Sequence, residues 1–272
     1  MTTGQTPQAA GSFPRIEPSV SVARIDEPTP EVEWPELRWW FIAPELGQSR
    51  RWAIYDSPQR ELADTYVLEV AGKTQVHEEE CFEIRQRRYD RGGRLAREAF
   101  AYGHVKAGIA RWLAWWNLSD TRKIHTYRDA SFADDWGRGD PIRLVDVGRY
   151  RWLDSDRFTD GHPRSTGQPD LVDPTGAGLW QLSVGETRIR CVRVIQVRRH
   201  PSGDPCRILD GFVTEDGKGV LRRRYEAADL SHSSWEGRTA RDILKGSATL
   251  TYNDATFLLW FDSLTEDVLA PR

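Results

Sequence analysis

Short runs of alternating apolar and polar residues, separated by glycine-containing turns, dominate this chain. The clearest run covers residues 66–84, YVLEVAGKTQVHEEECFEI, where even-numbered positions carry Tyr66, Leu68 and Val70 before Gly72 and Val76, Phe82 and Ile84 after it. A period of two is typical of a β-strand that buries one face. The pattern therefore predicts strands over residues 66–70 and 74–89, joined by a turn at the glycine.

Alternation gives the second of these strands two different faces. One face is apolar and we expect it to join the core: Val76, Phe82 and Ile84. The other face carries the densest local group of ionisable side chains: His77, Glu79, Cys81 and Glu83. Glu78 and Glu80 fall on the supposed core face, so a bulged or edge strand with the opposite assignment is an open alternative.

The same pattern predicts further strands and hairpins along the chain. Residues 98–118 are consistent with a hairpin that turns at residues 106–108, and Gly103 and Gly108 argue against the competing helix. Other strands are expected at residues 51–56, 123–128 and 142–153, a short helix at residues 238–246, and a closing hairpin that turns at Asn253–Asp254. The fold prediction is a mainly β protein: an antiparallel curved sheet or open β-barrel with few short helices.

A weaker echo of the first run occurs at residues 180–194, WQLSVGETRIRCVRV. Aligning Gly72 with Gly185 suggests two related halves, at about residues 50–130 and 142–262, with chance similarity as the alternative. Residues 1–33 lack a sustained period, so we expect a disordered tail that is dispensable for folding, followed by one β-rich domain over residues 34–272. The Gly-, Pro- and Asp-rich residues 155–178 are interpreted as a long loop.

Composition narrows the classes of function. The 272 residues carry a net charge of −3 and a pI of about 6.1, which favours neither nucleic acid nor an anionic membrane as a partner. The three cysteines have no metal-binding or redox spacing, and no metal or cofactor is predicted. The first residues lack a basic and an apolar leader segment, so a cytoplasmic location is expected.

Twelve tryptophans and a strong preference for arginine over lysine suggest a recognition surface. The first functional hypothesis is a protein that binds an apolar or aromatic small molecule in the concavity of the sheet. Arginines would orient the molecule, and the expected ligand-binding residues are Trp112, Trp116, Trp152, Trp180, Arg111 and Arg222.

Two alternatives from other classes remain. One is an enzyme in which His77 and Glu79, with His125, act as acid/base or metal-binding groups in the same concavity. The other is a structural or interaction module without a pocket. No G-x-S-x-G, Walker A or G-x-G-x-x-G motif occurs, which lowers the expectation of a serine hydrolase, NTPase or dinucleotide-binding protein.

Overall fold

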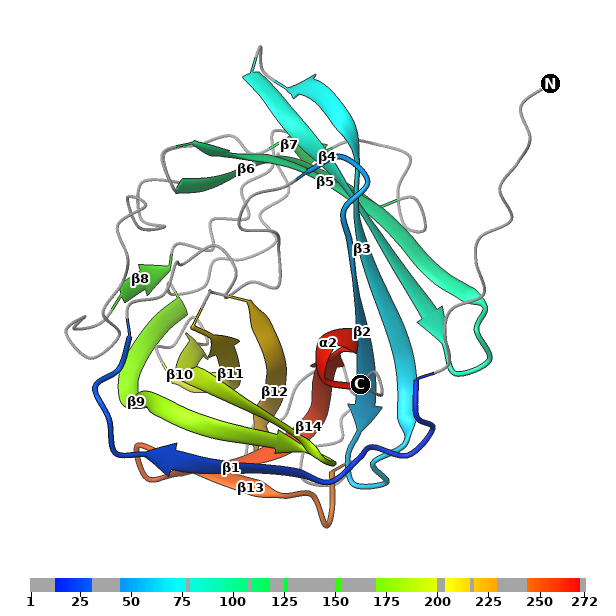
Figure 1. Cartoon of the computed structure of the whole chain (residues 1–272). Helices are drawn as coiled ribbons and strands as arrows, with labels where there is room; N and C mark the ends of the chain where they lie inside the picture. Colours follow the sequence, from blue (N-terminus) through cyan, green and yellow to red (C-terminus); the bar gives the residue numbers. More distant parts are fainter. Residues whose placement is uncertain are drawn as a thin grey trace.

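The computed structural model describes residues 13–30, 45–76, 79–106, 109–117, 125–126, 150–152, 170–199, 204–215, 218–228 and 244–269. These residues form one 14-stranded sheet with a single short helix (Figure 1). The elements are β1 (Val20–Ile25), β2 (Ser49–Asp56), β3 (Leu62–Val76), β4 (Glu79–Asp90), β5 (Leu95–Lys106), β6 (Ile109–Asn117), β7 (His125–Thr126), β8 (Tyr150–Trp152), β9 (Asp170–Val184), β10 (Thr187–Arg199), β11 (Pro205–Thr214), β12 (Gly219–Ala227), β13 (Thr249–Tyr252), β14 (Ala255–Thr265) and α2 (Glu266–Leu269).

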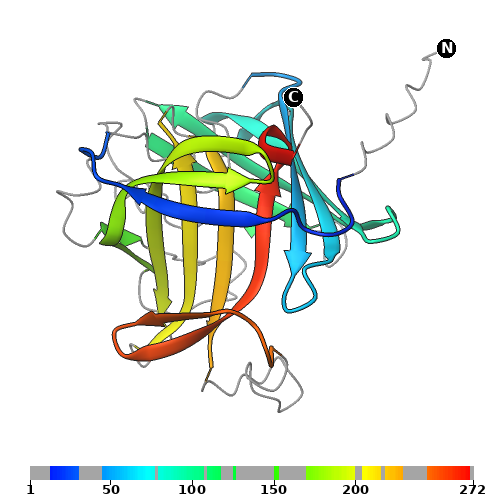
Figure 2. The same cartoon turned by 60° about the horizontal axis from the view of Figure 1, so that its bottom comes forward.

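The strands follow the order β1-β9-β10-β11-β12-β14-β2-β3-β4-β5-β6-β7, with β13 paired to β14 and β8 paired to β9. Neighbouring strands are antiparallel, and the sheet curves so that β9 and β1 face β12 and β14 (Figures 1 and 2). In the described part of the chain the sheet has two ends, β1 and β7. The predicted class, a mainly β protein with an antiparallel curved sheet, is confirmed.

The first predicted hairpin exists, but its turn was placed wrongly. β3 continues through Gly72, and the chain reverses only after Val76, which pairs with Glu79. The register shifts between Val70 and Gly72, and Gly72 does not take a positive φ. A β-bulge keeps the strand running where the sequence indicated a turn. Gly185 does lie in a turn, with φ +57°, so the two aligned glycines are not equivalent and the internal repeat stays a prediction.

Other turns agree with the sequence pattern. Asn253 and Asp254 both have positive φ, 46° and 64°, as a two-residue type I′ hairpin turn requires. Residues 95–106 and 109–117 form strands rather than a helix, and Lys106 pairs with Ile109. The expected loop over residues 155–178 is too long, because β9 already begins at Asp170. Most of the helix predicted at residues 238–246 lies outside the described residues.

The N-terminal segment is part of the fold, so the prediction of a disordered tail over residues 1–33 is wrong for its described portion. β1 pairs with β9 from Val20↔Val184 to Ile25↔Leu179. Just before it, Glu17 N donates to Arg60 O, and Leu62 N donates to Arg15 O. Residues 13–25 therefore form a strap that pairs with both β9 and the β2–β3 turn. The alternating sequence VSVARI was the overlooked signal.

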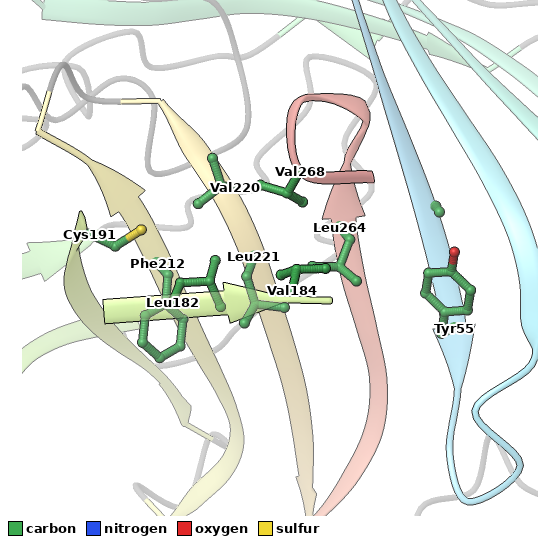
Figure 3. Close-up of a cluster of buried hydrophobic side chains, with 10 residues drawn as sticks. Tyr55, Leu182, Val184, Cys191, Phe212, Val220, Leu221, Leu264 and Val268 are labelled. Atoms are coloured by element: carbon green, nitrogen blue, oxygen red, sulfur yellow. The ribbon is translucent and has the colours of Figure 1, made fainter. Parts of the chain in front are cut away.

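Two apolar clusters fill the inner face of β9–β12, β14 and β2. The first cluster includes Tyr55, Leu182, Phe212, Leu221 and Leu264, and Val268 of α2 packs against it (Figure 3). The second cluster lies further along the same strands and includes Ile195, Val197, Ile208, Tyr225 and Leu259. On β3–β5 a further buried cluster forms on the opposite face: Leu68, Val70, Ile84 and Ala101. No helix among the described residues is long and apolar enough to cross a membrane.

Candidate functional site

A row of alternating charges crosses the inner face between the first and second apolar clusters. On three successive strands the middle residue of an inward-facing triplet is charged: Cys191–Arg193–Ile195 on β10, Phe212–Asp210–Ile208 on β11 and Leu221–Arg223–Tyr225 on β12. The row extends onto β14, because Arg223 on β12 pairs with Asp210 on one side and with Asp262 of β14 on the other. Arg60 and Glu17 complete it. We call these six residues, Arg193, Asp210, Arg223, Asp262, Arg60 and Glu17, the ionic belt.

Each charge of the ionic belt lies beside one of opposite sign. Arg193 holds Asp210 with two bonds, Nε to Oδ1 at 2.7 Å and Nη2 to Oδ2 at 2.8 Å. Asp262 lies 3.4 Å from Arg223 Nε and accepts a bond of 2.9 Å from Arg60 Nη2. The side chains of Asp210 and Asp262 are 3% and 0% exposed. Buried charges persist when they are paired in this way, and these bonds link β10 to β11 and β12 to β14.

Glu17 brings the N-terminal strap into the belt. Its Oε2 lies 2.5 Å from Arg60 Nη2, and its side chain is 1% exposed. Burial and the neighbouring Asp262 carboxylate raise the pKa of Glu17 to about 8, against the lowering effect of Arg60. Tyr55 adds a second tie, because its hydroxyl donates to Pro14 O at 3.0 Å. Glu17 is therefore held in a carboxyl pair that favours its protonated form near neutral pH.

Beside the belt, Arg193 also belongs to an aromatic group at the β1 end of the sheet. Its guanidinium lies over the rings of Trp180 and Phe212, with Cζ 5.0 Å and 5.8 Å from the two centroids. The two rings meet edge to face at 6.3 Å. Cation–π stacking and the bonds to Asp210 fix the position of this guanidinium.

Gly178 brings the backbone of β9 close to Arg24 and to the Trp180 ring. It pairs with Arg193, and a Cβ at this position would lie 3.7 Å from Arg24 Nε and 3.8 Å from Trp180 Nε1. Trp180 Nε1 is buried and has no hydrogen-bond partner in the described part of the chain. Arg24 is exposed and makes no ion pair within the described ranges. We call Arg24, Gly178, Trp180, Arg193 and Phe212 the Trp180 corner.

The residues expected to act as catalytic groups are not assembled into a described site. His77 lies outside the described residues, and Glu79 is the first residue of β4. His125 is on β7 and pairs with Trp115, and nothing more of its environment is described. Among the described residues no group of three His, Cys, Asp or Glu side chains could hold a metal ion.

The expected polar face of β4 is partly a core face. Cys81 is buried with Phe100 and Tyr102, while Ile84 on the other face is buried in a separate cluster. Burial, reinforced by Glu79 and Glu83, raises the pKa of the Cys81 thiol to about 11. A thiol of this kind is a weak nucleophile at neutral pH. The strand thus buries both faces, where the sequence pattern had assigned only the Ile84 face to the core.

The six expected ligand-binding residues are distributed over different parts of the sheet. Trp180 lies on the inner face of β9, whereas Arg222 lies opposite Ser263 on the outer face of β12. These two do not share a surface, which corrects the idea of one common lining. Three others occupy β6, where Arg111 pairs with His104, Trp112 with Gly103 and Trp116 with Phe100. Trp152 pairs with Asp170 at the start of β9.

Sequence reasoning missed Arg24, Arg193 and the ionic belt. Arg24 lay inside the segment interpreted as a tail, although it follows Val20 and Val22 at the same period of two. Asp262 and Asp210 each interrupt an apolar strand at an inward position, and an inward charge in several neighbouring strands was the available signal.

Comparison with known proteins identifies no family for this chain. No family model matches the sequence, and no curated protein matches it. One solved structure is similar, a protein from Bacteroides fragilis described as "a putative exported protein with YmcC-like fold". The identity is 10%, the match covers 83% of this chain and 97% of the other, and the TM-score is 0.33.

The expectation of a cytoplasmic location is not upheld, since the matched protein is described as exported. The expectation rested on the composition of the first residues, which does not determine a compartment. We withdraw it, and a TM-score of 0.33 assigns no other location in its place.

Proposed function

We propose that this protein binds a small aromatic or apolar molecule that carries an acidic group, and that the Trp180 corner is its recognition site. The supporting observation is the buried Trp180 Nε1, a donor without an acceptor in the described part of the chain. Buried indole N–H groups usually find a partner, because leaving one unpaired costs about 1–3 kcal/mol. An acceptor from a ligand would remove this cost.

The surroundings of the donor favour a negatively charged acceptor. Arg24 Nε and Trp180 Nε1 both lie within 4 Å of the position that a Cβ of residue 178 would take. Two donors, one of them cationic, therefore lie close to one point beside the Gly178 backbone. A carboxylate, sulfonate or phosphate oxygen placed between them would accept from both. Because residue 178 is glycine, no side chain of its own lies between the two donors.

The same corner supplies apolar contact for the rest of the molecule. Trp180 and Phe212 present an edge-to-face pair, and Arg193 is stacked on both rings. Because Arg193 is already bound to Asp210, its position is fixed before a ligand arrives. Preorganised aromatic and guanidinium groups bind at a smaller entropic cost than mobile ones.

The experiment is a fluorescence titration with 8-anilinonaphthalene-1-sulfonate, an aromatic sulfonate that matches the proposed ligand class. We expect saturable binding to the native chain and a roughly tenfold weaker affinity for Arg24→Gln, which removes one charge-assisted contact. Trp180→Phe retains an aromatic ring but removes the N–H donor, and should weaken binding to a similar degree.

The matched control is Arg188→Gln, since Arg188 is an exposed arginine on the outer face of β10. It should bind the probe as the native chain does. Thermal unfolding of each variant shows whether the fold is retained. Equal affinities for the native chain, Arg24→Gln and Arg188→Gln would refute the assignment of the Trp180 corner.

A further inference from the structure

Two arginines on the outer face of the sheet share one carboxylate oxygen. Arg207 Nε and Arg224 Nε both donate to Glu226 Oε1, at 2.8 Å and 2.6 Å. Arg207 pairs with Glu226 across β11 and β12, and Arg224 lies two residues before Glu226 on β12. These positions alternate with those of the ionic belt, so the three side chains lie on the opposite face of the sheet.

This group has an excess of positive charge in a partly desolvated place. The Glu226 side chain is 7% exposed, and those of Arg207 and Arg224 are 27% and 26% exposed. Among the described residues, one carboxylate faces two guanidinium groups, an excess of one positive charge. Burial, together with the nearby Arg207, lowers the pKa of Arg224. An additional anion would balance the excess positive charge and would favour the charged form of Arg224.

The donors needed to hold such an anion are present and unused. Each guanidinium has five N–H groups, and the bonds to Glu226 use only the Nε–H of each arginine. Within the described residues, the Nη groups of Arg207 and Arg224 make no hydrogen bond. About a quarter of each side chain remains exposed, so these groups can be reached from solvent.

The arrangement is also rigid. The Arg224 guanidinium lies over the rings of Trp260 and Phe261, with Cζ 5.3 Å and 5.4 Å from their centroids. Stacking on aromatic rings and a bond to a buried carboxylate restrict the rotation of this side chain before any ligand binds. Planar guanidinium forks held in this way match the oxygens of a tetrahedral oxyanion.

We propose that Arg207 and Arg224 form a binding site for a phosphate-type oxyanion, separate from the Trp180 corner. Glu226 sets the separation of the two guanidinium groups, and the free Nη–H donors hold the oxyanion. The ligand class is a small molecule that carries a phosphate or sulfate group.

Isothermal titration calorimetry with inorganic phosphate tests this site, with sodium chloride adjusted to hold the ionic strength constant. We expect saturable binding by the native chain that weakens by about tenfold in both Arg207→Gln and Arg207→Lys, since lysine keeps the charge but loses the fork. Glu226→Gln should bind phosphate more tightly, because it removes the competing negative charge. Arg190→Gln, at an exposed arginine paired with Glu27 and Glu215, should bind as the native chain does.

Two further measurements separate loss of the phosphate site from loss of the fold and from loss of the Trp180 corner. Each variant is first checked by thermal unfolding, and Arg207→Lys serves as the test if Arg207→Gln does not fold. Arg207→Gln is also titrated with the aromatic sulfonate probe, whose affinity should not change if the two sites are separate. Absence of saturable phosphate binding by the native chain, or equal phosphate affinity in Arg207→Lys, would overturn the proposal.

Discussion

At the scale of single residues, Glu17 is the least expected feature of the molecule. A carboxyl group from the N-terminal strap lies buried near Asp262, and Arg60 contacts both carboxylates. Two carboxyl groups in one buried place cannot both ionise without a penalty, so one of them retains its proton. Burial and the Asp262 carboxylate raise the pKa of Glu17, so Glu17 is the group that keeps its proton.

The pKa of Glu17 gives a prediction with a definite sign. Its pKa is about 4.5 in the unfolded chain and about 8 in the folded protein, so the folded state binds the extra proton between these values. Stability should therefore fall as pH rises from about 4.5 to 8, by at most about 1.4 kcal/mol per pH unit for one proton. Glu17→Gln mimics the protonated form and should lack this contribution.

Thermal unfolding followed by circular dichroism between pH 4 and pH 9 measures the effect. The Tm of Glu17→Gln relative to the native chain should increase across the window from about pH 4.5 to pH 8. Glu27→Gln is the control, because Glu27 is exposed and Arg190 lowers its pKa. A difference between Glu17→Gln and the native chain that does not change with pH would contradict the assignment.

Asp210 gives a second residue-scale prediction. Replacing Asp210 with Asn leaves the partly buried Arg193 without its counter-charge, and breaking such a pair typically costs about 3–5 kcal/mol. The double variant Arg193→Met/Asp210→Leu removes both charges and should recover most of the loss. Urea unfolding provides the free energies. Glu215→Gln, in an exposed pair, should change stability by less than about 1 kcal/mol.

The sequence could indicate some of these residues but not their partners. Trp180 was expected at a ligand site because tryptophan is large and frequent here, and the structure places it in the Trp180 corner. Its partners Arg24 and Arg193 come from two other strands. Which residues become cross-strand neighbours depends on register, and single-sequence alternation does not determine register across a sheet.

At the scale of elements, strands were easier to predict than the turns between them. The Asn253–Asp254 turn was found because both residues tolerate positive φ, a strong local requirement. Gly72 was misinterpreted because a glycine in a strand can mark either a turn or a bulge, and only pairing with the neighbouring strand distinguishes them. β1 was missed because it is a strand of only six residues that follows a polar segment.

The role of β1 can be tested with two adjacent substitutions. Val22 packs against the first apolar cluster, whereas Ala23 is exposed on the other face of the same strand. Val22→Asp places a charge against the core and should destabilise the protein by several kcal/mol, on the order of 3. Ala23→Asp should change stability by less than about 0.5 kcal/mol. Urea unfolding of both variants tests the strap, and equal small effects would show that β1 is dispensable.

At the scale of the whole molecule, two groups of strands meet at one junction. β9–β12 and β14 stand on one side, β2–β6 stand on the other, and β14 joins β2 from Phe261↔Asp56 to Thr265↔Trp52. This ladder is shorter than the β3–β4 or β10–β11 ladders. The N-terminal strap reinforces it, since it pairs with β9 and also bonds to residues 60 and 62.

We therefore expect the two groups of strands to unfold in one cooperative transition. Leu221→Ala removes a buried side chain on one side of the junction, and Leu68→Ala removes one on the other. Each should cost about 2–5 kcal/mol from lost burial and the resulting cavity. In both variants, urea transitions followed by circular dichroism and by tryptophan fluorescence should shift together, as a two-state system requires.

If Leu68→Ala instead shifts only part of the transition, the strap and the short ladder do not couple the two groups. Opening at the β14–β2 junction would then be the first step of unfolding, and β2–β6 would be the less stable part of the sheet.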